Sequence, residues 1–361
     1  MNFASDNGAG VAPEILRAIA AAASVNAPAY GADDWTARAR ASLGAVFERD
    51  VAAFLVSTGT AANALALGAV TRPWRGVFCH EEAHIQDDEC GAPELFTGGA
   101  KLVGIPGEAG KITPAVLRQT LARYPAGLAK SVQPGALSLS QANEAGVIYT
   151  LEEISALAAI AKDAGCAVHM DGARFANAIA AAGCSPADMT WRAGVDVLSL
   201  GATKNGALAC EAVIFFDPAR AADFEFQRKR GGHTLSKGRF LGAQMEAWLK
   251  DGLWLDLARR ANAAARRLAS ALAACEGVRP VWPTQVNEVF VALPDSAVAA
   301  LRAGGATLGE WSSRALAPAA APRPGEAFVR LVCSFETSAA EIDQLIAIVG
   351  SAVAKAKRSG A

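Results

Sequence analysis

Residues 166–205 decide the fold, and they read CAVHMDGARFANAIAAAGCSPADMTWRAGVDVLSLGATKN. Within them, Cys166–Met170 and Val195–Leu200 are short apolar segments with the length and β-branched content of strands. A helical stretch lies between the two segments, and Ser185 followed by Pro186 is typical of a helix start. The pattern predicts a β-α-β unit. Open parallel sheets bind ligands at the carboxyl ends of their strands, so the residues after each strand are candidates for a site.

Ionisable and hydroxyl side chains follow both strands of this unit. Asp171 and Arg174 follow the first strand, and Thr203 and Lys204 follow the second. A lysine among small residues can form a Schiff base with an aldehyde, and a carboxylate keeps a pyridine nitrogen protonated. We therefore predict pyridoxal 5'-phosphate held by Lys204 and Asp171, with Arg174 near the ring hydroxyl and Thr203 adding a hydroxyl. A surface lysine in a Gly-rich turn, and an Arg174–Asp171 ion pair, are the alternatives.

Other stretches supply groups that such a cofactor and its substrate need. Thr58-Gly59-Thr60 joins a buried-strand pattern to an Ala-rich helix, so we expect Gly59 and Thr60 to bind the phosphate through backbone N–H groups. His84, in a polar loop, can stack on the ring or act as a base, or it is a solvated loop histidine. Arg330, in a strand pattern, can bind a substrate carboxylate in a bidentate manner, or form an internal ion pair.

Two further groups of polar residues have plainer interpretations. His169 shares a strand face with Asp171, so it either supports that carboxylate or is a hydrogen-bonded core histidine. Asp87, Asp88 and Glu89 form a charge run, which is usually a solvated face. His80 and His84 have H-x-x-x-H spacing, but they lie at a strand end and in the polar loop after it rather than on one helix face, so we expect no metal site.

Length and composition indicate a globular protein of more than one domain. A chain of 361 residues is too long to fold around one hydrophobic core of typical size. The composition, with 52% hydrophobic and 19% charged residues, is not that of a disordered chain. A net charge of −1 offers no electrostatic footprint for nucleic acid or an acidic membrane surface. Seven cysteines without a C-x-x-C motif, and an N-terminus without a signal-peptide pattern, favour free thiols in the cytoplasm.

An alternation of strand and helix patterns begins near Val51 and predicts an α/β fold, with a mostly parallel sheet between helices. We expect an N-terminal arm (1–40), a large cofactor-binding domain including a connecting helix (41–254) and a small α+β domain (255–361). Besides the central unit, the predicted strands are Val51–Ser57, Gly76–Cys79, Lys101–Ile105, Ala136–Leu139, Ala212–Phe216, Val278–Trp282, Val289–Ala292 and Phe328–Cys333. The longer predicted helices are Pro13–Ala23, Ala61–Val70, Thr150–Asp163, Pro218–Arg230 and Phe240–Ala274.

Several motifs together carry a resemblance to a known family. They are FASDN, YGADDW, TGTAAN, EEAHIQDDECGAPE, HMDGARFANA, GATKNG and VRLVCSFET, and they span most of the chain. The chain resembles the threonine aldolases, fold-type-I (aspartate aminotransferase-like) pyridoxal phosphate enzymes, and is most similar to the bacterial low-specificity L-threonine and phenylserine aldolase branch. The resemblance implies retro-aldol cleavage of L-threonine, L-allo-threonine or related β-hydroxy-α-amino acids to glycine and an aldehyde, in a homodimer or homotetramer with shared active sites.

The same resemblance implies a role for individual residues. It places Lys204, Asp171, Arg174, Gly59 and Thr60 in the cofactor roles described above. His84 corresponds to the family's ring-stacking histidine, Ser5 and Arg330 to the groups that bind the substrate carboxylate, and Glu89 to an active-site acid. Asn143, in SLSQANEAGV, stands about where many members have a histidine that handles substrate. Lys237, or else Arg239, corresponds to a basic residue that reaches the phosphate of a neighbouring subunit.

Other functions remain open at this point. β-Elimination, racemisation and transamination use the same scaffold, and a non-catalytic cofactor-binding homologue is a further alternative. The combination of Lys204, Asp171, Arg174, His84 and Arg330 argues against the latter, because a binding module needs no proton-transfer group and carboxylate clamp. A Rossmann-type nucleotide enzyme is disfavoured, since no G-x-G-x-x-G follows the first strand.

Overall fold

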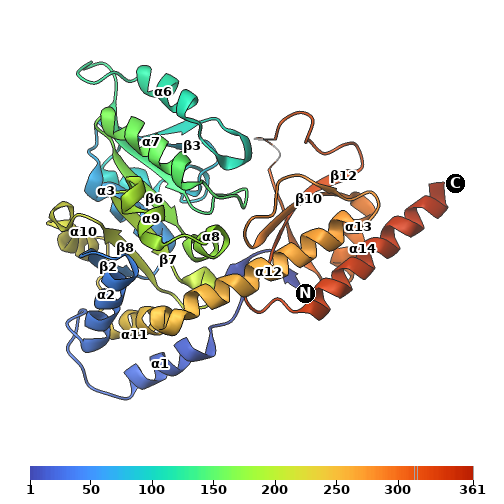
Figure 1. The fold of residues 1–361 in the computed structure, drawn as a ribbon, viewed down its shortest axis with the longest axis horizontal. Helices are drawn as coiled ribbons and strands as arrows, with labels where there is room; N and C mark the ends of the chain where they lie inside the picture. Colours follow the sequence, from blue (N-terminus) through green and yellow to red (C-terminus); the bar gives the residue numbers. More distant parts are fainter. Residues whose placement is uncertain (313, 315, 361) are drawn as a thin grey trace.

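The computed structural model describes residues 1–312, 314 and 316–360 and contains two sheets side by side (Figure 1). The larger, seven-stranded sheet has the order β2-β8-β7-β6-β5-β3-β4, and the smaller, five-stranded sheet has the order β1-β11-β12-β10-β9. The strands of the large sheet are β2 (Ala52–Val56), β3 (Arg75–His80), β4 (Lys101–Ile105), β5 (Gln133–Ser140), β6 (Ala167–Gly172), β7 (Val197–Gly201) and β8 (Glu211–Phe215). Those of the small sheet are β1 (Asn2–Phe3), β9 (Arg279–Pro280), β10 (Glu288–Pro294), β11 (Thr307–Glu310) and β12 (Glu326–Val332).

Helices cover both faces of the large sheet, which confirms the predicted α/β class. One face packs on α3 (Gly59–Val70) and α10 (Phe224–Arg230). The other face carries the main core, to which several longer helices contribute. These are α1 (Pro13–Ala23), α2 (Asp34–Val46), α6 (Pro114–Ala122), α7 (Leu151–Asp163), α8 (Phe175–Ala182), α11 (Arg239–Leu249) and α12 (Leu253–Ala273). The remaining α-helices are α4 (His84–Asp87), α5 (Ala92–Thr97), α9 (Pro186–Met189), α13 (Asp295–Ala303) and α14 (Ala339–Gly360).

The order of the central strands brings the candidate residues to one edge of the large sheet. β6 pairs in parallel with β5 and β7, and β3 pairs in parallel with β4 and β5. β8 instead runs antiparallel to both β2 and β7. The connection between Gly201 and Glu211 is too short for the crossover helix that a parallel pairing needs. The first residue of β8 therefore lies at the carboxyl ends of β2 and β7.

Three predicted elements differ from the observed ones. The helix predicted over Phe240–Ala274 is two helices, α11 and α12, because Asp251 and Gly252 adopt positive φ values of 53° and 75°. The helix predicted over Pro218–Arg230 is a 3-10 turn (Pro218–Ala221) followed by α10. The strand predicted over Val278–Trp282 is reduced to β9, at the sheet edge, where Pro280 has no N–H to donate.

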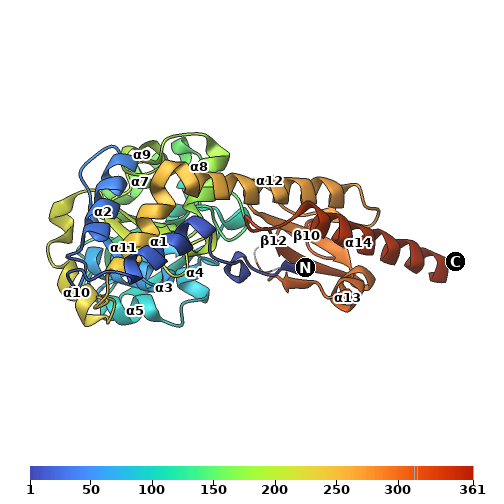
Figure 2. The same cartoon turned by 90° about the horizontal axis from the view of Figure 1, so that it is seen from below.

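Helix α12 connects the two parts of the molecule. It packs on α8 at one end and on β10 and α14 at the other, and Figure 2 shows it running from the large part into the small one. The domain boundary predicted before residue 255 falls inside this helix. β1, from the predicted N-terminal arm, pairs with β11, so the start of the chain joins the small sheet. No helix within the described residues is both long and apolar enough to span a membrane.

Candidate active site

A cavity of about 560 Å³ opens at the carboxyl edge of the parallel strands, next to the small sheet. Its walls come from the start of α3, from the ends of β5, β6 and β7, and from the small sheet. Nearly every candidate residue predicted from the sequence lines it: Ser5, Gly59, Thr60, His84, Glu89, Asn143, Asp171, Arg174, Thr203, Lys204 and Arg330. Lys237 does not line it, so from its own chain it contributes nothing to this cavity.

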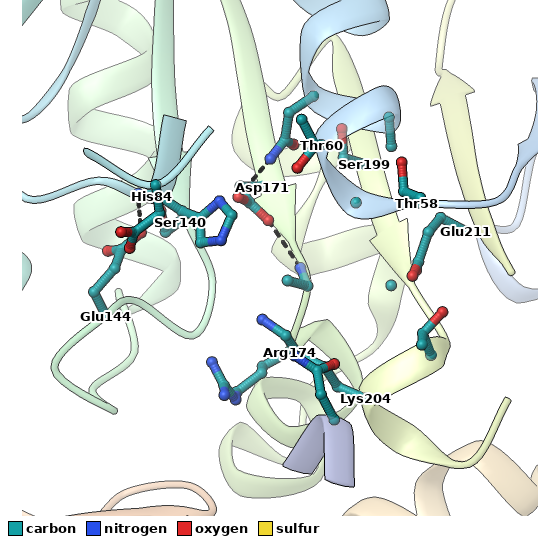
Figure 3. A pocket seen from close by; sticks show the side chains of 18 of the residues that line it. Thr58, Thr60, His84, Ser140, Glu144, Asp171, Arg174, Ser199, Lys204 and Glu211 are labelled. Atoms are coloured by element: carbon teal, nitrogen blue, oxygen red, sulfur yellow. Dashed lines mark hydrogen bonds between the residues drawn. The ribbon is translucent and has the colours of Figure 1, made fainter. Parts of the chain in front are cut away.

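Lys204 enters the cavity from a rigid turn directly after β7. Its neighbour Asn205 is buried, donates to the carbonyl of Trp254 at 2.8 Å and accepts a hydrogen bond from Trp248 Nε1 at 3.0 Å. Thr203 Oγ1 accepts a hydrogen bond from the Cys210 N–H at 3.1 Å. Within the described residues, the half-buried Lys204 makes no hydrogen bond or ion pair (Figure 3). Its amine is therefore held in place by its turn and is free for a ligand.

Asp171 ends β6 on the opposite side of the cavity from the tip of that lysine (Figure 3). Its Oδ1 accepts the Ala173 N–H at 2.9 Å, and its Oδ2 accepts a hydrogen bond from Asn63 Nδ2 at 2.8 Å. Asn63, on α3, also donates to Glu89 Oε1 at 2.8 Å. One amide thus orients two buried carboxylates. Asn63 was not predicted as a site residue; the only signal is an amide inside an otherwise Ala- and Leu-rich helix.

His169 lies fully buried beneath this site. Its Nδ1 is hydrogen-bonded to Ser138 Oγ at 2.9 Å and its Nε2 to Ser199 Oγ at 3.0 Å. Burial lowers the pKa of His169 to about 4, so the ring is neutral. Because both ring nitrogens are hydrogen-bonded to serines, His169 makes no hydrogen bond to Asp171, and of the two interpretations these contacts favour the hydrogen-bonded core histidine.

His84 faces Asp171 across one end of the cavity (Figure 3). Its Nδ1 is hydrogen-bonded to Glu89 Oε1 at 2.9 Å, and its backbone N–H donates to Glu144 Oε1 at 2.9 Å. The hydrogen bond that His84 donates to Glu89 raises the pKa of His84 against the effect of burial, and burial raises the pKa of Glu89. Glu144, which also accepts from Ser140 Oγ at 2.7 Å, was not predicted. The His84 ring is therefore oriented by the Glu89 carboxylate, and its backbone is held by Glu144.

Asn143 lines the cavity but is engaged in its own loop. Its Nδ2 donates to the Ala109 carbonyl at 2.8 Å, and its Oδ1 accepts the N–H groups of Ala145 and Val147, both at 3.1 Å. The side chain thus closes the turn over residues 143–147.

Arg174 pairs with Asp6, not with Asp171 as the alternative interpretation held. Its Nε and Nη2 donate to the two carboxylate oxygens of Asp6, each at 2.9 Å, and Glu288 lies 3.4 Å from the same guanidinium. Burial tends to raise the pKa of Asp6, but the charges of Arg174 and Lys204 hold it below its usual range. This buried ion pair joins the N-terminal segment to the large sheet, and Glu288 extends it to the small sheet.

Arg330 lies at the small-sheet wall of the cavity. Its guanidinium stacks on Trp311 at 4.1 Å and makes long contacts to Glu288 Oε1 at 3.5 Å and to the Ala4 carbonyl at 3.4 Å. Its buried Nε has no hydrogen-bond partner within the described residues. Ser5, beside it, caps a 3-10 turn by accepting the Asn7 N–H at 3.1 Å. An arginine with weak contacts and an unused donor is suited to bind an added carboxylate.

Comparison with known proteins places the chain in a family. The beta-eliminating lyase family matches residues 2–296. A low-specificity L-threonine aldolase of Pseudomonas aeruginosa is 42% identical over 348 residues, covering 95% of each chain. This chain belongs to the threonine aldolase family. A second such aldolase, from another Pseudomonas species, is 40% identical over 96% of each chain.

Solved structures agree with this assignment. The Leishmania major threonine aldolase superposes with a TM-score of 0.89 at 29% identity, covering 98% of this chain and 99% of that one. A serine palmitoyltransferase of Sphingomonas wittichii has a TM-score of 0.68 at 17% identity and shows the shared fold. The fold is thus that of the fold-type-I enzymes, as the threonine aldolase resemblance implied.

The N-terminus of α3 has the open backbone that an anion can approach. Thr58 caps the helix by accepting the Ala61 N–H at 3.1 Å. Gly59 and Thr60 occupy the first helical positions, where backbone N–H groups lack partners inside the helix. A Cβ on Gly59 would meet no atom within 4 Å, so this backbone faces open space. The free lysine amine, the buried Asp171 and this open helix start together fit pyridoxal 5'-phosphate.

Two basic residues after α10 were predicted as alternatives for a phosphate contact from a neighbouring subunit. Arg239 Nε donates to the Ala22 carbonyl at 2.9 Å, and its guanidinium stacks on Phe240 at 5.1 Å. Lys237 is exposed. Because Arg239 is engaged within its own chain, Lys237 stays the predicted residue for a contact between subunits.

Arg174→Met should lower the free energy of unfolding by about 3–5 kcal/mol, because it leaves two carboxylates, Asp6 and Glu288, buried without their main cation. Urea denaturation followed by circular dichroism measures this loss. Arg192→Met is the matched control: Arg192 also pairs with two carboxylates, but the pairs are exposed and contribute little. Equal losses in the two variants would show that the Arg174 cluster does not stabilise the fold.

Proposed function

We propose that this protein cleaves L-threonine, L-allo-threonine and related β-hydroxy-α-amino acids, such as phenylserine, to glycine and an aldehyde, with pyridoxal 5'-phosphate as cofactor. The observation that carries the proposal is the single cavity in which an unpaired lysine amine, a buried carboxylate and an open helix N-terminus face one another. The relatives at 40–42% identity, which are named low-specificity L-threonine aldolases, support the reaction.

The cavity offers a group for each part of the cofactor. Lys204 would hold the aldehyde carbon, and Gly59 and Thr60 would bind the phosphate together with the Thr203 hydroxyl. Asp171 would hold a proton on the pyridine nitrogen, and Arg174 would lie near the ring hydroxyl. When bound, the cofactor supplies an electron sink for the pair released from the broken Cα–Cβ bond.

Other side chains would orient the amino acid and move its protons. Arg330, with its unused Nε donor, and Ser5 would bind the substrate carboxylate, which fixes how the Cα–Cβ bond lies. His84 would take the β-hydroxyl proton on Nε2, because its Nδ1 is committed to Glu89 at 2.9 Å. Asn63 donates hydrogen bonds to both Glu89 and Asp171. Because Glu89 in turn holds the His84 ring, these bonds would fix the position of the base relative to the carboxylate at the pyridine nitrogen.

Product analysis tests the reaction. The protein loaded with cofactor should release acetaldehyde and glycine from L-threonine and L-allo-threonine, and benzaldehyde from phenylserine, and should leave the D forms intact. Serine and alanine serve as probes of the alternatives, since β-elimination yields pyruvate from serine and racemisation scrambles the alanine Cα. Pyruvate release faster than aldehyde release would favour the elimination that the family's general description suggests.

Arg330→Lys should raise the KM for L-threonine by about 10–100-fold while kcat falls much less, because a lysine makes one point contact where the guanidinium makes two. Steady-state kinetics of glycine formation measure both constants. Arg323→Lys is a suitable control, because Arg323 belongs to the small part of the molecule and does not line the cavity. A fall in kcat with an unchanged KM would contradict a carboxylate-binding role for Arg330.

We also propose that the protein is cytoplasmic and works as a homodimer or homotetramer with shared active sites. Its cysteines are free thiols, as a reducing compartment requires. Large apolar side chains are exposed on the large part of the molecule, including Leu95 and Phe226 at 74% each. Lys237 can serve a phosphate only in a second subunit, since it does not line the cavity of its own chain. Sedimentation equilibrium distinguishes these assemblies from a monomer.

A further inference from the structure

Glu211 is a buried carboxyl group that lies between the two turns that would hold the cofactor. It is the first residue of β8, and the register pairs it with Val56 on β2 and with Gly201 on β7. Since β8 runs antiparallel to both, Glu211 lies at their carboxyl ends. The phosphate turn begins just after Val56, and the Lys204 turn begins just after Gly201. Glu211 is 6% exposed and lines the cavity.

The side chain of Glu211 points to the α3 side of the sheet. Val213 and Phe215, which share its strand face, belong to the core cluster that includes Ala61 and Leu65 of α3. Figure 3 shows Glu211 and Thr58, the first residue of the turn into that helix, on the same side of the cavity, and both residues line it. The carboxyl group therefore faces the place where the backbone N–H groups of α3 would bind a phosphate.

The contacts of Glu211 leave its charge only partly compensated. Its Oε2 accepts the Ala202 N–H at 2.8 Å, and its carboxyl group is hydrogen-bonded to Thr203. The cation that acts on it most is Lys204, and the neighbouring titratable group is the buried Cys210 thiol, whose pKa burial raises. β2, β7 and α3, the elements packed around it, contain no charged residue.

Burial raises the pKa of Glu211 to about 7, although the Thr203 and Ala202 hydrogen bonds and Lys204 act in the opposite direction. The carboxyl group therefore exchanges its proton near neutral pH before any anion is present. A phosphate dianion bound at the start of α3 would add negative charge nearby, and a nearby like charge favours the neutral form of a carboxyl group. Protonation removes this repulsion and gives the carboxyl group an O–H donor.

We propose that Glu211 forms part of the phosphate site as a protonated carboxyl group, so that binding of the cofactor phosphate takes up a proton from solution. The inference rests on the proposed cofactor function and concerns its binding step. The proton moves from the buffer to a carboxylate oxygen of Glu211, and the covalent attachment of the cofactor to Lys204 would be the same in the wild type and in Glu211→Gln. Sequence reasoning had no reason to select this residue, because an acid before an apolar run also fits the surface end of a strand.

Calorimetric titration of the cofactor-free, full-length protein with pyridoxal 5'-phosphate tests the inference. Titrations in two buffers of different ionisation enthalpy give the number of protons taken up. At about pH 8 the wild type should take up about one proton more than Glu211→Gln, because Glu211 is largely ionised before binding. At about pH 6 the difference should disappear, because the free protein already carries the proton. Equal proton numbers in the two proteins at the higher pH would overturn the inference.

Affinity gives a second and independent measurement. Relative to Glu211→Gln, the wild type should lose affinity by about tenfold per pH unit above the pKa of Glu211, since each binding event then requires a proton. The wild type alone also provides a test if the variant does not fold. Titrated with pyridoxal, which has no phosphate, it should lack the extra proton uptake at about pH 8. The same uptake with and without the phosphate would overturn the inference.

These outcomes are separate from a failure of the proposed function. If the wild type does not bind pyridoxal 5'-phosphate, both the cofactor assignment and this inference are wrong. If it binds the cofactor with equal proton uptake in both proteins, only the inference is wrong. If proton uptake follows Glu211 but threonine is not cleaved, the inference holds and the retro-aldol assignment is wrong.

Discussion

Lys204→Ala should reduce glycine formation from L-threonine by on the order of 10⁴-fold and abolish the visible absorbance of bound cofactor. Lys204 is the amine that enters the cavity without a partner within the described residues, so no other group there can replace it as the covalent attachment. Absorbance spectra of the protein incubated with pyridoxal 5'-phosphate, and a coupled aldehyde assay, measure both effects.

A chemical test identifies the lysine directly. Borohydride reduction of the loaded wild type, followed by mass spectrometry of its peptides, should place the cofactor mass on Lys204. Lys101→Ala is the matched control, because Lys101 is an exposed lysine of the same sheet, outside the cavity. Cofactor mass on another lysine, or normal glycine formation by Lys204→Ala, would refute the assignment.

Asp171→Asn should lower kcat by about 10³-fold with little effect on the fold, because an amide cannot hold the pyridine nitrogen protonated as a carboxylate does. The isosteric amide keeps one acceptor, for the Ala173 N–H at 2.9 Å, but its NH2 group would face the donor Asn63 Nδ2, so the hydrogen bond at 2.8 Å is lost at a modest cost in stability. Steady-state kinetics at saturating cofactor measure the loss, and circular dichroism checks the fold.

The control for this variant lies in the same sheet. Asp196→Asn changes a carboxylate that accepts the Val168 N–H at 2.8 Å, at the start of β6, away from the cavity. It should keep kcat close to that of the wild type. A loss at Asp171→Asn no larger than that at Asp196→Asn would mean that the charge of Asp171 is not used in the reaction.

Local sequence patterns were sufficient to predict most helices and strands and the functional groups at the ends of the central strands. The segment 166–205 predicted a strand, a helical stretch and a strand, and β6 and β7 lie there with α8 and the short helix α9, which Ser185 caps, between them. The capping box at Thr150 and Glu153 opens α7 with both of its hydrogen bonds in place. Such patterns are read within a few residues, because capping and strand alternation depend on neighbours in the chain. Asp251 shows the limit of such reading, since the Asp-Gly pair at residues 251–252 is a turn signal that the predicted continuous helix did not take into account.

The groups that hold the site together come from distant parts of the chain. Asp6 pairs with Arg174 across 168 residues, and Asn63 reaches Asp171 across 108. Glu288, on the small sheet, contacts both Arg174 and Arg330. No periodic sequence pattern predicts such pairs, because the topology of the two sheets determines how far apart in the sequence the paired residues lie. Arg174 was therefore assigned the wrong alternative partner, and Asn63, Glu144, Glu211 and Glu288 were not predicted at all.

The sequence alone determined the α/β class, the strand ends that carry Asp171 and Lys204, and the helix start at Gly59, since each depends on short-range patterns. Only the tertiary structure decided which side chains are free and which are used. It showed that Lys204 has no partner within the described residues, that Asn143 is bound to its own loop, and that Glu211 lies between the two cofactor turns. The physical reason is that the partners of a side chain depend on its burial and on contacts between strands that are far apart in the sequence. The order of the strands in the sheet sets these contacts, and the antiparallel strand β8 sets them for Glu211.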